Sequence, residues 1–253
     1  MSSEISNILI TGASSGIGEA LAEYYAKNGA KNLFLSGRNE QRLNAVAERC
    51  RQQGATVYPK IINVGNKEAM ADWLAECENK APLNLVIANA GVSTGEETPE
   101  NIYNTFETNV FGVLNTITPA VENYKRSAEK RKIIAITSSI AGYHGLPSCP
   151  SYSATKACVK AYGEALRSSL LPQNIQVNII CPGFVKSRIT DKNTCPMPFF
   201  MSAEKAAEII AARIDKNVGL IAFPWPMRFA TWFFSILPNR LSDFIYAKLP
   251  HKV

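Results

Sequence analysis

Histidine is scarce in this chain of 253 residues, which contains only His144 and His251. Its six cysteines, at positions 50, 77, 149, 158, 181 and 195, form no C-x-x-C pair and no local cluster. The ligand spacings of a structural zinc site are therefore missing, and we predict no bound metal. Reduced structural thiols in a cytosolic protein are the preferred interpretation, because disulfides are rare in that compartment.

Targeting signals and long apolar runs are also missing. Residues 1–4 offer no basic region and no long apolar stretch follows them, so a secretory signal is not expected. The longest apolar stretch near the end, residues 229–237, is far shorter than the roughly 20 residues of a membrane-spanning helix. We therefore expect a cytoplasmic protein that does not cross a membrane.

The charge balance is basic, with a formal net charge of +6. Such a charge raises nucleic acid or an anionic membrane surface as a partner. Residues 1–181 carry 17 basic and 16 acidic side chains, whereas residues 182–253 carry 10 basic and 5 acidic ones. Because no basic stripe with a recognition motif appears, we predict no nucleic-acid binding. The excess charge belongs to the last part of the chain.

Short apolar runs alternate with helix-length stretches along most of the sequence. The expected strands are residues 8–10, 33–35, 57–62, 85–87, 133–136, 175–180 and 220–223. The expected helices are residues 16–28, 40–53, 67–80, 100–122, 151–170 and 203–216. Near-continuous apolar strands suit a parallel sheet covered on both faces, and the repeated alternation predicts a doubly wound α/β fold. We expect one domain over residues 1–223, with a mainly parallel seven-stranded sheet.

The tail after residue 223 breaks this rhythm. Pro224, Pro226 and Pro238 bracket an apolar stretch, and two short helices are expected at residues 227–237 and 240–249. Residues 224–253 thus form a short helical extension of the same domain.

The first expected strand leads directly into a glycine-rich turn at residues 11–18. Glycines let the backbone approach a pyrophosphate and free the N-terminal N–H groups of the next helix to meet its charge. The spacing is G-x-x-x-G-x-G rather than the general G-x-G-x-x-G fingerprint, so an ordinary strand-to-helix turn is the alternative. The candidate phosphate-binding residues are Gly12, Ser14, Ser15, Gly16, Ile17 and Gly18.

Arg38 follows the second expected strand, where a dinucleotide fold that prefers NAD places an acidic residue on the ribose. A guanidinium can bond a 2′-phosphate through two N–H groups, so Arg38 favours NADP(H). The alternative is a solvated arginine that the nearby Glu40 neutralises.

Tyr152 and Lys156 lie four residues apart and share one face of an expected helix. A neighbouring cation stabilises a phenolate and lowers the tyrosine pKa towards the working range. A Tyr–Lys pair alone is weak evidence, since a surface pair has the same spacing. Ser139 supports the assignment because it ends the fifth expected strand, and ligands bind at the carboxyl ends of strands in such sheets.

Taken together, these motifs resemble the short-chain dehydrogenase/reductases, in their compact single-domain branch. The resemblance covers about residues 5 to 223 and is carried by residues 11–18, 88–91, 108–112, 139, 152, 156 and 182–183. Two positions depart from the family pattern: Asn63 stands where the family usually has aspartate before Val64, and Asn84 replaces another aspartate.

The resemblance implies a Rossmann domain, a homodimer or homotetramer, and a set of roles. Tyr152 would be the general acid/base, Ser139 would polarise the substrate oxygen, and Lys156 would lower the tyrosine pKa and hold the nicotinamide ribose. Asn109 would anchor a water in the proton relay. Further cofactor contacts are implied for Asn63, Val64, Asn89, Ala90, Gly91, Pro182, Gly183 and Val185.

The substrate side is expected in a lid at about residues 184–201, which ends in the apolar stretch 196–201. Methionine and phenylalanine there suit an apolar substrate, although packing of the lid onto the domain explains them equally well. His144 and Phe184 are the candidate substrate contacts.

The tail at residues 225–253 combines aromatic with basic side chains. This composition suits a helix in a membrane interface, a subunit contact or a cap over the substrate pocket, and packing is the more common outcome.

The sequence therefore predicts an NADP(H)-dependent oxidoreductase for a carbonyl/alcohol pair. The alternatives are an NAD-dependent alcohol dehydrogenase and a catalytically silent NADP-binding regulatory protein. A nucleotide-sugar epimerase is disfavoured, because those enzymes carry a larger C-terminal substrate domain.

Overall fold

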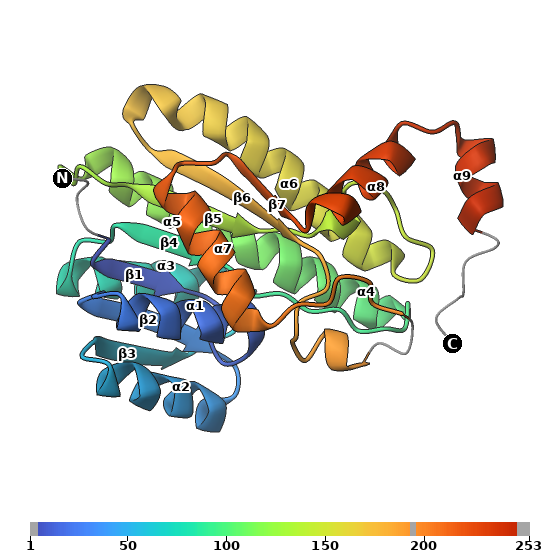
Figure 1. The fold of residues 1–253 in the computed structure, drawn as a ribbon. Helices are drawn as coiled ribbons and strands as arrows, with labels where there is room; N and C mark the ends of the chain where they lie inside the picture. Colours follow the sequence, from blue (N-terminus) through green and yellow to red (C-terminus); the bar gives the residue numbers. More distant parts are fainter. Residues whose placement is uncertain (1–4, 193–195, 247–253) are drawn as a thin grey trace.

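The computed structural model describes residues 5–192 and 196–246. Within them, seven strands form one sheet in the order β3-β2-β1-β4-β5-β6-β7, as Figure 1 shows. The strands are β1 (Asn7–Ile10), β2 (Asn32–Gly37), β3 (Thr56–Ile61), β4 (Leu85–Ala88), β5 (Ile133–Thr137), β6 (Gln176–Pro182) and β7 (Leu220–Phe223). The predicted doubly wound domain is confirmed. Every neighbouring pair of strands is parallel, which is stricter than the mainly parallel sheet expected.

Helices cover both faces of the sheet (Figure 1). They are α1 (Gly16–Lys27), α2 (Glu40–Gln52), α3 (Lys67–Lys80), α4 (Pro99–Phe106), α5 (Gly112–Arg126), α6 (Pro150–Leu170), α7 (Ala203–Asp215), α8 (Trp225–Ser235) and α9 (Asn239–Tyr246). Side chains alternate along each strand, so Ile8 and Ile10 join the core under α1, α2 and α7. Leu9 joins the second core, under α3, α5 and α6. Two apolar layers thus hold the carboxyl ends of the strands in a fixed row.

The predicted helix over residues 100–122 is wrong in one respect, because it is not continuous. A π-helix at Glu107–Phe111 separates α4 from α5. This wider turn inserts an extra residue and brings Asn109, which is fully buried, towards the loop that follows β4. Hydrophobic periodicity cannot reveal such an insertion, since the apolar pattern continues on both sides of it.

The tail forms two helices, as the sequence predicted. α8 leaves β7 at the carboxyl edge of the sheet, and α9 lies beyond it, away from the body of the domain (Figure 1). Residues 247–249 of the second expected helix lie outside the described residues. No helix within the described part of the chain is long and apolar enough to cross a membrane.

Candidate active site

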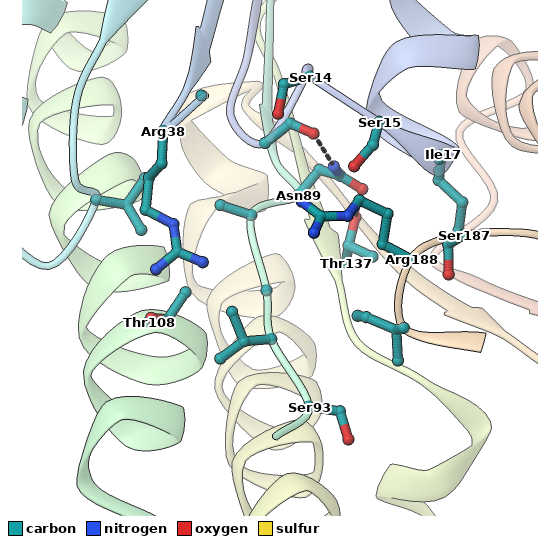
Figure 2. Close-up of a pocket in the computed structure, with 18 of the residues that line it drawn as sticks. Ser14, Ser15, Ile17, Arg38, Asn89, Ser93, Thr108, Thr137, Ser187 and Arg188 are labelled. Carbon is teal, nitrogen blue, oxygen red and sulfur yellow. Dashed lines mark hydrogen bonds between the residues drawn. The ribbon is translucent and has the colours of Figure 1, made fainter. Parts of the chain in front are cut away.

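A cleft of about 640 Å³ lies at the carboxyl ends of the strands, where the strand order reverses between β1 and β4. Figure 2 shows polar side chains pointing into it from several elements. The predicted residues that line it are Gly12, Ser14, Ser15, Gly16, Ile17, Arg38, Asn63, Val64, Asn89, Ala90, Gly91, Ser139, Tyr152, Lys156, Pro182, Gly183 and Val185. Residues far apart in the sequence thus meet in one site.

The glycine turn forms one wall of the cleft. Gly12 has a φ of +67°, and a Cβ at this position would lie 2.7 Å from the Ala90 Cα, so a larger residue is excluded. Gly18 does not line the cleft. A Cβ on Gly18 would lie 2.3 Å from the Gly12 carbonyl oxygen, so this glycine allows α1 to pack closely against the turn.

Asn89 and Thr11 hold this turn against β4. The Asn89 side-chain amide donates to the carbonyl oxygens of Thr11 and Gly12, at 3.1 and 3.3 Å. In return, the Thr11 hydroxyl accepts hydrogen bonds from the backbone N–H groups of Asn89 and Ala90. The shape of the turn is therefore set by polar contacts between the first and fourth strands.

The N-terminus of α1 opens onto the cleft. Its N-cap, Ser15, makes no side-chain capping bond, and both Ser15 and Gly16 line the cleft. The first N–H groups of a helix lack partners within the helix and carry the positive end of its dipole. Together with glycines that no side chain can replace, these groups fit the pyrophosphate of a dinucleotide.

Arg38 stands exposed at the far end of the cleft, after β2. Within the described residues, no ion pair joins it to Glu40 or to another carboxylate. The guanidinium groups of Arg38 and Arg188 enter the cleft from opposite sides in Figure 2. The basic end of the site is therefore available to an anion.

Arg42 is a second basic residue at this end, and the sequence reasoning missed it. It lies four residues after Arg38, lines the same cleft, and has a buried Nε atom with no hydrogen-bond partner in the structure. Buried N–H groups normally have partners, and an anion bound at this end of the cleft would supply the missing acceptor. The sequence signal that could have found Arg42 is its position four residues after Arg38, at the start of α2.

Tyr152 and Ser139 meet on the opposite wall. α6 carries the tyrosine, and the serine lies two residues after β5, at the N-cap of a short 3-10 helix. The serine hydroxyl hydrogen-bonds the tyrosine side chain. Burial raises the pKa of Tyr152 to about 12, and the hydrogen bond from Ser139 offsets only part of this effect. The phenol is therefore protonated at neutral pH and able to donate.

Lys156 lies beneath the tyrosine. Its Nζ atom donates to the Thr137 carbonyl oxygen at 2.9 Å and lies 5.6 Å from the centre of the Tyr152 ring. Burial lowers the pKa of Lys156 to about 8. The predicted lowering of the Tyr152 pKa is thus not seen, because the effect of burial on the phenol dominates.

Asn109 is buried behind the cleft and does not line it. Its Oδ1 atom accepts from the Val92 N–H at 2.8 Å, and its Nδ2 atom donates to the Val92 carbonyl and to the Thr155 hydroxyl. The side chain therefore joins the loop after β4 to the helix that carries Tyr152. A water bound by Asn109 stays a prediction.

This architecture is similar to that of known proteins. A family model described as short chain dehydrogenase matches residues 6–196. The chain belongs to the short-chain dehydrogenase family.

An uncharacterized oxidoreductase of Myxococcus xanthus is 35% identical over 240 residues, which cover 93% of this chain and 94% of that protein. Two solved short-chain dehydrogenases share the fold. One from Sphingobium yanoikuyae in complex with NADPH has a TM-score of 0.80 and 23% identity, and covers 97% and 96% of the two chains. One from Mycobacterium paratuberculosis bound to NAD has a TM-score of 0.76 and 19% identity, with coverages of 87% and 96%.

The structure does not bring His144 or Phe184 into the lining of this dehydrogenase cleft. Both side chains are half-buried nearby, and substrate contact by either one stays a prediction. In the lid, Phe199 and Phe200 are exposed, whereas Met201 packs against the first core and pairs with Val185. The packing interpretation therefore holds for Met201 but not for Phe199 and Phe200.

Several polar residues that the sequence did not single out also line the cleft. They come from the segment after β4, from α4 and the π-helix, and from the lid. They are Ser93, Thr94, Asn101, Asn104, Thr108, Ser187, Arg188 and Thr190. No spacing rule finds them, because they converge only through the crossover connections of the sheet. The five cysteines within the described residues are unpaired thiols, and Cys195 lies outside those residues.

Proposed function

We propose that this oxidoreductase uses NADP(H) to interconvert a carbonyl and an alcohol. One observation carries the proposal: Tyr152, Ser139 and Lys156 line the same cleft as the glycine turn and Arg38. An acid/base group and a dinucleotide-binding turn thus share one space. Among the structural neighbours, one is described with NADPH and another with NAD, so both cofactors have precedents on this fold.

The cofactor would lie along the cleft from the basic end to the catalytic wall. The N-terminus of α1 would hold the pyrophosphate, and Arg38 with Arg42 would pair with a 2′-phosphate. Asn63 and Val64 would contact the adenine end. When bound, the nicotinamide supplies the hydride acceptor or donor of the reaction.

Tyr152 would act on the substrate oxygen. In the reductive direction its protonated hydroxyl would donate a proton to the carbonyl oxygen as that oxygen gains negative charge. Ser139 would donate a second hydrogen bond to the same oxygen and polarise it. A tyrosine that is protonated at neutral pH can supply this proton, and reduction is proposed as the direction because reduced NADP usually dominates in cells.

Lys156 and Asn109 would position these groups. The Lys156 ammonium, held on the Thr137 carbonyl one helical turn from Tyr152, would hold the nicotinamide ribose by a hydrogen bond. Asn109 would keep α6 in register with the loop after β4 through Thr155 and Val92.

An apolar substrate remains part of the proposal. Phe199 and Phe200 stay exposed on the lid and would meet such a substrate when the lid closes over it. A homodimer or homotetramer is also proposed from the family resemblance.

Initial rates with NADPH and NADH on a panel of small ketones, steroids and long-chain keto-lipids test this function. We expect oxidation of NADPH with at least one carbonyl class and a higher kcat/KM than with NADH. Equal or better rates with NADH would favour the NAD-dependent alternative. Tight NADPH binding with no turnover across the panel would favour the silent regulatory protein.

A further inference from the structure

The helix α8 presents an apolar face that no other described residue covers. Its members are spaced i, i+4, i+7, i+8 and i+11, which is one side of a helix. This aromatic face consists of Trp225, Phe229, Trp232, Phe233 and Ile236. All five are exposed, Trp225 at 77% and Ile236 at 59%, and α8 contains no buried residue. A contiguous apolar surface of this kind marks a contact with another body.

The face is continuous rather than a set of scattered side chains. The ring of Phe229 lies 5.8 Å from that of Trp232 and 6.5 Å from that of Phe233, centre to centre. These rings contact one another along the helix while their outer edges remain in water. Removing such a surface from water is favourable in proportion to its apolar area.

The opposite side of α8 fixes the helix on the domain. Met227 packs against the second core, and its sulfur lies 3.1 Å from where a Cβ on Gly183 would be. The Thr231 hydroxyl bonds back to the Met227 carbonyl at 2.9 Å. The aromatic face is therefore held outwards by packing beside the catalytic edge, where Gly183 lines the cleft.

Positive charge accompanies the face. Arg228 and Arg240 are exposed on α8 and α9. By sequence, residues 224–253 carry four basic side chains and one acidic one. Aromatic side chains in a helix with flanking cations are the composition of helices that lie in the interface of an anionic bilayer.

We propose that the aromatic face of α8 binds the surface of a membrane that contains anionic phospholipids. The helix would lie in the interfacial plane, with its rings among the upper acyl chains and its arginines on the headgroups. A second copy of this chain fits less well, because a two-fold contact would bring two equally cationic tails together. An anionic lipid surface complements both the apolar and the charged part.

This placement has a consequence that rests on the proposed function. Because the opposite side of α8 packs on Gly183 at the catalytic edge, binding would hold the domain, and its cleft with it, close to a bilayer in which apolar carbonyl compounds dissolve. Binding itself does not depend on the reaction.

Co-sedimentation of the full-length protein with vesicles tests the proposal. We expect binding to phosphatidylcholine vesicles that contain phosphatidylglycerol, weaker binding to phosphatidylcholine alone, and a loss of binding as salt rises. The fluorescence of Trp225 and Trp232 should shift to shorter wavelength on binding, whereas the buried Trp73 should not respond. Equal binding to both vesicle types, or none, would overturn the proposal.

Matched variants test whether vesicle binding depends on the aromatic face itself rather than on overall hydrophobicity or net charge. The double variant Phe229→Ser/Trp232→Ser should lose binding by roughly tenfold or more, because it removes much of the inserted apolar area. The control Tyr103→Ser/Leu171→Ser, which changes two apolar side chains exposed elsewhere, should bind as the unchanged protein does. Likewise, Arg240→Glu should weaken binding more than Lys31→Glu does, with the same change in net charge.

Activity on a water-soluble carbonyl compound shows, independently of vesicle binding, whether a variant is folded and functional. The double variant on α8 should keep this activity and its thermal midpoint, which shows that the fold and the reaction are intact. If that variant binds vesicles normally but loses an oligomeric state in sedimentation equilibrium, the face is a contact between copies and the membrane proposal is wrong. Absence of activity in every variant would remove the proposed function but leave the vesicle result standing.

Discussion

The Glu97 carboxylate accepts hydrogen bonds from both the backbone N–H and the hydroxyl of Ser151, at 3.2 and 2.8 Å. Ser151 lies in the first turn of α6, next to Tyr152, and the N-cap of this helix, Cys149, makes no capping bond of its own. A carboxylate from the loop after β4 therefore caps the catalytic helix from outside and complements its dipole.

Replacing Glu97 with alanine should reduce both stability and turnover. Loss of the external cap should lower the free energy of unfolding by about 1 kcal/mol, as for other N-caps. Because Tyr152 lies in the turn that loses its cap in this variant, kcat should fall while the KM for cofactor changes little. Urea unfolding and steady-state kinetics measure these effects. Glu96→Ala removes a neighbouring exposed carboxylate and is the matched control; equal effects of the two variants would refute the capping role.

Replacing Arg38 or Arg42 should change the choice of cofactor. Each guanidinium is expected to form charge-assisted hydrogen bonds with a 2′-phosphate, so Arg38→Ser or Arg42→Ala should raise the Kd for NADPH by roughly tenfold or more. The Kd for NADH should stay nearly constant, since NADH has no phosphate at that position. Fluorescence titration of both cofactors measures this. A parallel loss for NADH would show that the arginines shape the cleft rather than bind phosphate.

Tyr152→Phe should abolish turnover, because the variant keeps the ring and removes the proton donor. Cofactor affinity should remain within about twofold, since the hydroxyl is assigned to the substrate oxygen. Measuring NADPH consumption and NADPH binding on the same preparation checks both the loss of turnover and the retained cofactor affinity. Retained turnover would show that another group supplies the proton.

Lys156 should make stability rise with pH over a defined window. Burial lowers its folded-state pKa to about 8, below the unfolded value, so between about pH 8 and 10 the unfolded chain binds more protons than the folded one. The free energy of unfolding should therefore increase with pH in this window, by up to about 1.4 kcal/mol per pH unit from this group.

The matching experiment compares the unchanged protein with Lys156→Met at each pH. The difference cancels groups that the two proteins share, including the buried thiols, whose raised pKa values act in the opposite direction above about pH 9. We expect the stability of the unchanged protein relative to the variant to rise from pH 8 to 10. A constant difference would mean that Lys156 is charged in the folded protein throughout.

The fold was predictable because apolar runs and glycine turns are local signals. β1, the turn after it and α1 follow from residues 8–28 alone, and the strand order places their ends in one row. The residues that line the cleft at these ends were predictable for the same reason, since each follows a strand.

The remainder depends on contacts that the sequence does not express. The π-helix persists because Asn109 pairs with Val92, which lies seventeen residues earlier in the chain. Arg42 looks like an ordinary helix residue until its Nε atom is found buried without a partner. From the sequence alone, Phe199 and the aromatic face of α8 could be either buried or exposed, because tertiary contacts decide their exposure.

The loop after β4 is fastened to α6 at two points. Asn109 joins Val92 to Thr155, and Glu97 bonds Ser151. The intervening residues 93–96 form a span anchored at each end to the helix that bears the proton donor, and Ser93 and Thr94 face the cleft. Replacements within this span could reshape the substrate wall while both anchors keep Tyr152 in place. New substrate preferences could therefore arise here without rebuilding the reaction centre.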